Sequence, residues 1–272
     1  MRLRRPAVAD SRAERAARYL LQAHQRRQKF GPLPEEFAPR TLEEAYAVQA
    51  AYVGLRSESN GPVCGYKVAL TTEAMRRHTG LAEPVAGDLL EGTVRRSPAR
   101  VRAADFVRLL VEFELAFELG EDLPAVDAPY DRRRVAQAVR AAMPAFELAD
   151  DRDADYERLR EHALVLVADN AWNEGVVLGA ARTDWHLLDL AGLRGEAYAD
   201  GKCLGAGRGG DVMGHPLEAL AWLANHLARR GLGLWRSDVV ITGSLVPTHT
   251  ARPGETLRFD AGPLGEVALQ VH

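Results

Sequence analysis

The sequence predicts an α+β fold in which a helical extension precedes a β-rich domain. Two observations indicate this class. The first sixty residues carry helix-capping signals and a helical spacing of apolar residues, whereas after residues 57–62 short runs of Val, Leu, Phe and Ile alternate with Gly, Pro and Asp. Because we find no internal repeat and no linker, we expect a helical N-terminal extension over residues 1–60 and one β-rich domain over residues 61–272.

Two helices are expected in the extension. Residues 11–28 have the apolar spacing of an amphipathic helix that begins at Ser11. Thr41 and Glu44, three residues apart, form a capping-box pattern for a second helix that reaches about Leu55.

The strand pattern is clearest in residues 107–119. Every second residue there is a large apolar one, so one face of the strand is wholly apolar. Asp200 and Gly201 have the chemistry of a hairpin turn. Further strands are expected at residues 64–70, 145–149, 164–168, 176–179, 238–243, 256–259 and 267–271.

Two further helices interrupt the strands. One follows Asp131, and the other begins at Pro216, reaches about Arg230 and ends at Gly231. We interpret His215 as part of the entry to that helix and not as a metal ligand. Residues 205–210 match the Gly-x-Gly-x-x-Gly spacing of dinucleotide-binding proteins, but no strand-turn-helix unit surrounds them, so we expect a flexible or pocket-edge loop.

The composition excludes several classes of protein. Hydrophobic residues make up 47% of the 272 residues and charged residues 27%, which is typical of soluble globular proteins. The formal charge of -3 provides no positive field for nucleic acid or an anionic membrane. Two cysteines are too few for a disulfide framework, and neither a signal peptide nor an apolar span stands out, so we expect a cytoplasmic protein.

Two acidic residues lie on the second face of the clearest strand. Glu112 and Glu114 are two residues apart, so their side chains point the same way, about 6.5–7 Å apart. A buried carboxylate without a partner must bind a proton or a cation, and a divalent metal ion would satisfy both residues. The alternative is an edge strand with one solvated face, which Glu118 on the same face would continue.

A third carboxylate strengthens the metal hypothesis. Glu147 lies within the apolar run of residues 143–149, where a surface position is hard to reconcile with its neighbours. Three carboxylates suit Mg²⁺ or Mn²⁺ better than zinc. A salt bridge between Glu147 and an arginine remains the alternative.

Lys67 interrupts another apolar strand, at residues 64–70. A lysine desolvated in this way can take part in proton transfer. The alternation of the strand is equally compatible with an outward-facing side chain.

The segment Gly65-Tyr66-Lys67-Val68-Ala69-Leu70-Thr71-Thr72 resembles a stretch of the 2-keto-4-pentenoate hydratase / 2-oxo-3-hexenedioate decarboxylase family of the fumarylacetoacetate hydrolase-like superfamily. Five more blocks resemble that family in the same order, so the resemblance runs from about residue 40 to the C-terminus. They are the Glu-x-Glu strand at 111–117, the segment 146–152, the Ala-Asp-Asn motif at 167–171, and the segments 214–223 and 238–245.

The resemblance implies a mixed β-sandwich roll of the fumarylacetoacetase C-terminal type, with residues 61–272 as the catalytic domain. It also implies a homo-oligomer. It assigns Glu112, Glu114 and Glu147 as ligands of Mg²⁺ or Mn²⁺ and Lys67 as a proton-transfer or substrate-orienting residue. Asn170, Thr242 and Ser244 would line the substrate pocket, although a buried Asn that satisfies loop backbone and an ordinary turn explain these residues equally well.

The implied activity is metal-dependent hydration of 2-hydroxypenta-2,4-dienoate-like 2-oxo or 2-hydroxy acids in aromatic-compound catabolism. A 4-oxalocrotonate-type decarboxylase and a C–C bond hydrolase or tautomerase are alternatives, because all of them stabilise an enolate. An inactive metal-binding or assembly module is an alternative of another class.

Two departures from the family pattern lie near the expected substrate. Where many hydratases carry Pro-Asp-Tyr/Phe-Gly, residues 84–87 read Pro-Val-Ala-Gly, so the acid is lost unless Asp88 or Glu83 replaces it. Where they carry small hydroxyl residues after Ala-Asp-Asn-Ala, this chain has Trp172 and Asn173. The sequence therefore supports metal binding better than it supports hydration as the reaction.

Overall fold

The N-terminal segment folds into the two expected helices. The computed structural model describes residues 11–272, so the first ten residues of the predicted extension lie outside the described residues. Helix α1 (Arg12–Gln25) begins after Ser11, whose hydroxyl accepts a hydrogen bond from the Glu14 N–H while the Glu14 carboxylate accepts one from the Ser11 N–H. This reciprocal capping box explains why the helix begins at this residue.

The second helix, α2 (Leu42–Asn60), is longer than predicted. Thr41 caps it as expected, by accepting a hydrogen bond from the Glu44 N–H at 3.1 Å. The Glu44 carboxylate accepts from the Arg40 N–H, one residue before the cap. The helix passes Leu55 and ends only at Gly61, whose φ of 76° ordinary residues adopt at a cost.

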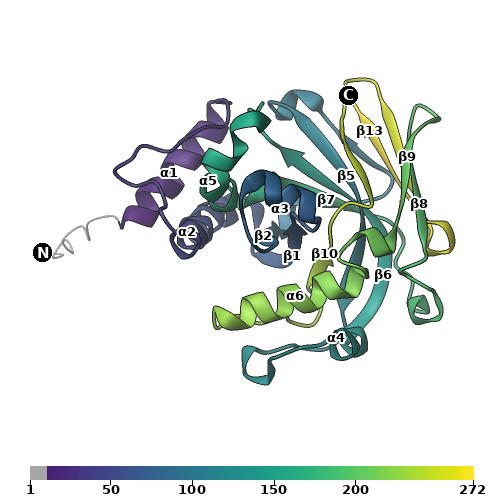
Figure 1. The fold of residues 1–272 in the computed structure, drawn as a ribbon. Coiled ribbons are helices and arrows are strands. Elements are labelled where there is room, and N and C mark those ends of the chain that lie inside the picture. Colours follow the sequence, from purple (N-terminus) through teal and green to yellow (C-terminus); the bar gives the residue numbers. More distant parts are fainter. Residues whose placement is uncertain (1–10) are drawn as a thin grey trace, which may run out of the picture.

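Two mixed sheets pack against each other, so the predicted α+β class is confirmed. Phe113 and Phe146 of the larger sheet meet at 5.6 Å between ring centroids, and Phe113 meets Phe259 of the smaller sheet at 5.8 Å. Figure 1 shows α1, α2 and α5 on one side of the molecule and the smaller sheet on the other.

The larger sheet has the order β2-β1-β10-β5-β6-β7-β3, with β11 paired to β5. Its strands are β1 (Val63–Ala69), β2 (Val85–Leu90), β3 (Val94–Arg96), β5 (Leu109–Leu119), β6 (Val139–Asp150), β7 (Asn173–Leu178), β10 (Val239–Ile241) and β11 (Val246–Thr250). The smaller sheet has the order β4-β13-β12-β8-β9. Its strands are β4 (Ala99–Val101), β8 (Arg194–Ala199), β9 (Lys202–Arg208), β12 (Thr256–Asp260) and β13 (Glu266–Val271).

The predicted strand at residues 164–168 is wrong. These residues form helix α5 (Ala163–Ala168), in which the Asp169 N–H donates to the Val165 carbonyl. A short, continuous apolar run has no periodicity that separates a buried helix from a buried strand. Helix α5 packs against α2, which buries almost every side of the run.

Strand β6 begins at Val139, six residues before the expected start. Pro144 lies within the observed strand. The Pro144 carbonyl accepts a hydrogen bond from the Gly179 N–H, just after the end of β7. The nitrogen and the carbonyl of a strand residue point to the same side. The nitrogen of Pro144, which carries no hydrogen, therefore also faces the end of β7, beyond the last residue pair of the β6–β7 ladder. The proline therefore removes no ladder hydrogen bond.

The later helices and turns agree with the predictions. Helix α6 begins after His215, whose Nδ1 accepts from the Leu217 N–H at 3.1 Å, and is followed by Gly231 with a φ of 72°. Asp200 and Gly201 both have positive φ in the β8–β9 hairpin. The helices not yet given are α3 (Glu73–Thr79), α4 (Arg132–Ala138) and α6 (Pro216–Arg229).

The glycine-rich segment 205–210 is not the expected loop. It forms the end of β9 and the start of a short 3-10 helix. A Cβ atom on Gly207 would lie 1.7 Å from the Leu245 carbonyl oxygen, so the glycine permits a close backbone approach beside the cavity described below. This packing explains the glycine without a bound nucleotide.

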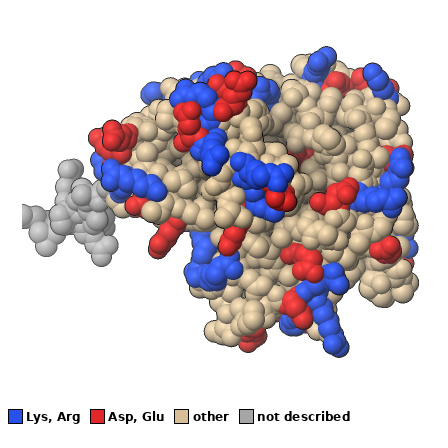
Figure 2. Space-filling view, in the orientation of Figure 1, with Lys and Arg blue, Asp and Glu red and all other residues tan. Residues whose placement is uncertain are grey.

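The described surface carries charges of both signs. Lys and Arg side chains are interspersed with Asp and Glu over the face in Figure 2. Within residues 11–272, no helix is long and apolar enough to cross a membrane.

Asp169 ties helix α1 to the β-rich part of the chain. The residue is 1% exposed, and its carboxylate lies 2.6 Å from His24 Nε2 on α1 and 2.6 Å from Arg152 Nη2. Burial alone would raise the pKa of Asp169, but His24 and Arg152 outweigh it and lower the pKa. The group is therefore a buried, ionised carboxylate held between two partners.

Replacing Asp169 by Asn should lower the free energy of unfolding by about 3–5 kcal/mol, because the change leaves the buried Arg152 charge without its counterion. Urea denaturation at neutral pH measures this loss. Asp153→Asn is the control, since Asp153 is exposed where it pairs with Lys29 and should change stability little. Equal stabilities for the two variants would contradict the role of Asp169.

Candidate active site

Three carboxylates converge at the pairing of β5 with β6, of which Glu114 and Glu147 are buried and Glu112 is half-buried. The register places Glu112 directly opposite Glu147, and Glu114 lies two residues farther along β5. One ligand oxygen from each of the three residues lies within 4.8 Å of the others. Strand β5 is bordered by β6 on one side and by β10 and β11 on the other, so it is not an edge strand.

Lys67 points inward and contacts this cluster. Its Nζ lies 2.9 Å from Glu147 Oε1 and donates to the Ala171 carbonyl at 2.7 Å, and the residue is 3% exposed. Asn173 also donates to Glu147 Oε1, at 2.8 Å. The ion-pair partner of Glu147 is thus Lys67 and not an arginine.

The electrostatics of the cluster favour a bound cation. Burial, followed by repulsion from Glu147, raises the pKa of Glu112 and raises that of Glu114 well above its usual range. Neutral donors compensate only partly: Gly243 N–H donates to Glu114 Oε2 at 2.6 Å, and the Thr248 hydroxyl donates to Glu112 Oε1 at 3.0 Å.

Glu114 Oε1 is buried and has no hydrogen-bond partner among the described residues. Such an orphaned oxygen beside two more carboxylates fits a hard divalent cation, which prefers oxygen ligands. The fourth acid of the strand face, Glu118, pairs with Arg140 and lies outside the cluster.

A cavity of about 680 Å³ lies beside the cluster. Lys67, Glu112, Ser244 and Thr248 give it one polar end, and much of the remaining wall is apolar. Its lining also includes three residues that the sequence did not single out, which are Arg108, Asp151 and Tyr156.

Of the three residues predicted to line the substrate pocket, Ser244 lies at the wall of this cavity. The Ser244 hydroxyl lies at the cavity wall, where it donates to the Val246 carbonyl at 2.7 Å. Asn170 bonds the backbone N–H and carbonyl of Asp88, and Thr242 donates to the Leu115 carbonyl. Asn170 and Thr242 are buried and are not among the residues that line this cavity, so their contact with a substrate stays a prediction.

Known proteins resemble the chain in sequence or in fold, although no protein-family model matches it. The 2-oxo-hept-4-ene-1,7-dioate hydratase of Escherichia coli is 31% identical over 259 residues, which are 93% of this chain and 96% of the relative. The 2-keto-4-pentenoate hydratase of Paraburkholderia phymatum is 31% identical over 95% of this chain and 97% of the relative. The 2-hydroxyhexa-2,4-dienoate hydratase of Comamonas testosteroni is 33% identical over 85% and 86%.

The chain belongs to the 2-keto-4-pentenoate hydratase family.

Two solved structures share the fold of this chain. The 4-oxalocrotonate decarboxylase of Pseudomonas putida G7, complexed with magnesium and adipate, has a TM-score of 0.87 and 23% identity over 98% of this chain and 100% of the other. The fumarylpyruvate hydrolase of Pseudomonas aeruginosa, with Mn²⁺ and pyruvate, has a TM-score of 0.60 and 16% identity over 76% and 88%. The predicted family and the prediction of a hydratase-type enzyme are confirmed.

Neither Asp88 nor Glu83 takes the place of the acid that is missing from the family pattern. Gly87 is the residue opposite Lys67, whereas Asp88 pairs with Tyr66 and so points to the other face of the sheet. Burial raises the pKa of Asp88 to about 6, but its carboxylate is not part of the cavity lining. Glu83 is exposed and pairs with Arg229 at 3.3 Å.

The other departure from the family pattern, at Trp172, lies in a strained turn. Asn170, Ala171 and Trp172 have φ values of 52°, 44° and 65°, a left-handed run that costs about 1–2 kcal/mol per residue. The two Asn170–Asp88 hydrogen bonds and the bond from Lys67 to the Ala171 carbonyl hold it. The turn thereby positions the Lys67 ammonium and places the Trp172 ring in the cavity wall.

The acidic cluster should make the stability of the metal-free protein fall with rising pH. Above the ordinary Glu pKa of 4.5, the two glutamates lose their protons in the unfolded chain. In the folded chain their raised pKa keeps Glu112 and Glu114 protonated to higher pH. Mg²⁺ bound to the ionised carboxylates would remove this penalty. The rise in Tm caused by saturating Mg²⁺ should therefore be at least about 2 °C larger near pH 8 than near pH 5.5.

Scanning calorimetry measures these shifts. Glu114→Gln is the matched variant, since it keeps an acceptor for Gly243 N–H but removes one charge. It should stabilise the metal-free protein and lose most of the Mg²⁺ shift. A shift independent of pH and unchanged in this variant would contradict the account.

Proposed function

We propose that the chain is a divalent-metal-dependent hydratase of 2-hydroxypenta-2,4-dienoate-like 2-oxo or 2-hydroxy acids, with Glu112, Glu114 and Glu147 as its metal ligands. The observation that carries the proposal is the convergence of these carboxylates with Lys67 at the polar end of a cavity whose wall is otherwise largely apolar. The names of the relatives support the substrate class. The substrates in those names include a dicarboxylic acid and monocarboxylic acids, so the names do not determine which chemical group the far end of the substrate carries.

The metal fits the donor set and supplies one kind of chemistry. Bound Mg²⁺ or Mn²⁺ acts as a Lewis acid that stabilises negative charge on the 2-oxo or enol oxygen and the adjacent carboxylate of the substrate. The structures similar to this chain contain magnesium, calcium or manganese ions, which agrees with oxygen ligands.

Lys67 supplies the proton chemistry in this proposal. Two of the three N–H groups of its ammonium face Glu147 and the Ala171 carbonyl, so one is left for a ligand in the cavity that Lys67 lines. Lys67 would move a proton between the enol and keto forms of the substrate. Water then adds to the conjugated double bond, and the apolar walls keep bulk solvent away from the enolate.

Decarboxylation of the 4-oxalocrotonate type is the second candidate. It uses the same stabilised enolate but needs no activated water. The observation in its favour is Val85, because the family acid is absent there and neither Asp88 nor Glu83 replaces it at the cavity.

We propose further that residues 61–272 act as the catalytic domain, that the chain assembles as a homo-oligomer, and that it works in the cytoplasm in aromatic-compound catabolism. Family membership supports these expectations, and the two free cysteines agree with a reducing compartment.

Ultraviolet progress curves with 2-hydroxypenta-2,4-dienoate test the activity. With Mg²⁺ the dienol absorbance should fall with formation of 4-hydroxy-2-oxopentanoate, and a chelator should stop the reaction. Lys67→Gln should lower kcat by about 10²–10⁴-fold, because it removes the proton-transfer group. Product analysis that finds CO₂ from 4-oxalocrotonate and no hydration would favour the second candidate.

Glu118→Gln is the matched control for Glu114→Gln. Glu118 lies on the same strand face but pairs with Arg140 outside the cluster, so its variant should keep full activity while Glu114→Gln loses it. Turnover that persists in chelator, or equal activity of the two variants, would contradict the proposal.

A further inference from the structure

Successive cross-strand residue pairs of β5 and β6, which we call tiers, line the cavity. The strand face that carries the metal-ligand candidates continues toward the start of β5, where each step of two residues advances about 6.8 Å. The tiers are Glu112 with Glu147, then Leu110 with Ala149, then Arg108 with Asp151 just beyond the last ladder pair.

The tiers make the cavity longer than a five-carbon acid needs. Arg108 lies four positions before Glu112, which corresponds to about 13–14 Å of extended strand. The carbon chain of pentadienoate has four bonds of about 1.5 Å and spans roughly half of that distance. A substrate held at the acidic tier therefore has space for a substituent beyond its fifth carbon.

The far tier is charged but already neutralised. Arg108 Nε donates to Asp151 Oδ1 at 2.7 Å, Nη1 donates to Asp153 at 2.8 Å, and Nη2 donates to Asp151 Oδ2 and to the Ala154 carbonyl. Asp151 is fully buried and also accepts from the Tyr156 hydroxyl at 3.0 Å. Four of the five N–H donors of this guanidinium are thus occupied, and two carboxylates balance its charge.

The cavity wall offers no other cation at this end. Among the residues described, Lys67 and Arg108 are the basic side chains in the lining, and Lys67 is bound at the acidic tier. A second carboxylate on the substrate would lie among apolar side chains without a counterion, and burying it there is costly. The apolar part of this wall includes Met75, Leu110, Leu159, Leu166 and Trp172.

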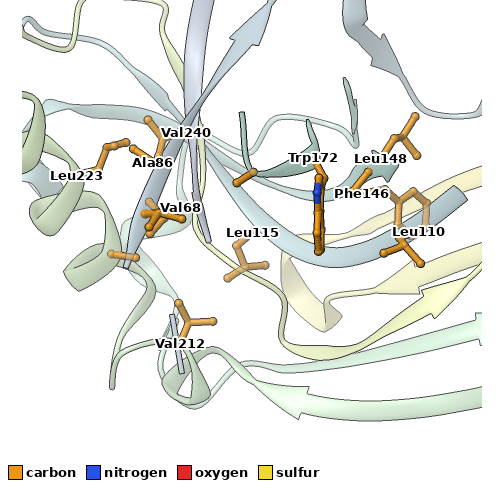
Figure 3. Close-up of a cluster of buried hydrophobic side chains, with 14 of the residues drawn as sticks. Val68, Ala86, Leu110, Leu115, Phe146, Leu148, Trp172, Val212, Leu223 and Val240 are labelled. Atoms are coloured by element: carbon orange, nitrogen blue, oxygen red, sulfur yellow. The ribbon is translucent and has the colours of Figure 1, made fainter. Parts of the chain in front are cut away.

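Trp172 gives the wall a rigid aromatic face. Its ring meets Phe30 edge-on at 5.1 Å between centroids and Tyr156 at 6.0 Å, and the left-handed turn fixes its backbone. Figure 3 shows it in the buried hydrophobic cluster that includes Leu110 and Leu148. An aromatic ring at this place favours an apolar ligand group by contact area and ring packing.

We infer that this cavity selects 2-oxo or 2-hydroxydienoic acids whose far end carries a neutral apolar group, alkyl or aryl, and that it rejects acids with a second terminal carboxylate. The inference rests on the proposed function, because the acidic tier must hold the 2-oxo acid end. Trp172 and the Arg108–Asp151 pair are the specificity-determining residues.

Calorimetric titration with substrate analogues that cannot be hydrated tests the inference. In saturating Mg²⁺, 2-oxohexanoate and 2-oxoadipate form a matched pair, because they differ only in a terminal methyl or carboxylate. We expect 2-oxohexanoate to bind at least about tenfold more tightly, and 2-oxo-6-phenylhexanoate to bind more tightly still. In Trp172→Ser, with its fold checked by circular dichroism, the gain from the phenyl group should be lost.

A charge introduced at the cavity wall provides the second test. Met75 lines the cavity and is 39% exposed, so Met75→Lys should fold normally and raise the affinity for 2-oxoadipate several-fold, while Met75→Gln should leave the ratio of the two affinities unchanged. Tighter or equal binding of 2-oxoadipate by the native protein would overturn the inference alone. Failure of every 2-oxo acid to bind with Mg²⁺ would overturn the proposed function and the inference with it.

Discussion

The antiparallel pairing of β5 with β6 is the constraint on which the site depends. It places Glu112 opposite Glu147 and aligns Glu114 with them on one face. A slip of one residue would turn these acids into the apolar core and the apolar residues toward the cavity. The alternating residues on the other face of β5, among them Phe113 and Leu115, are fully buried and so hold the register.

A second set of contacts holds the groups that face this ladder. The left-handed turn at residues 170–172 is strained, and it persists because Asn170 bonds the Asp88 backbone on one side while Lys67 bonds the Ala171 carbonyl on the other. Directly before the turn, Asp169 connects it to His24 on α1. The N-terminal helices are thereby joined to the turn that positions Lys67, which gives them a role in the site although their side chains do not line the cavity.

Local patterns of the sequence predicted the acidic cluster well, for a physical reason. Strand alternation places Glu112 and Glu114 on one face, and the apolar surroundings of Glu147 and Lys67 indicate buried partners. What local patterns missed depends on distant contacts. Arg108 and Asp151 are 43 positions apart and meet only because β5 and β6 pair, and the strained turn follows from contacts that no spacing reveals. Residues 164–168 became a helix because packing against α2 decided between two structures that the apolar run allows equally.

We propose that one divalent metal ion binds to Glu112, Glu114 and Glu147. Titration with Mn²⁺ followed by electron paramagnetic resonance tests it most directly, because free and bound Mn²⁺ give separate signals. We expect one tight Mn²⁺ site per chain, from which Mg²⁺ displaces the Mn²⁺. This site should be lost in Glu147→Gln and retained in Glu118→Gln. A tight site that survives Glu147→Gln, or native protein that leaves all Mn²⁺ free, would contradict it.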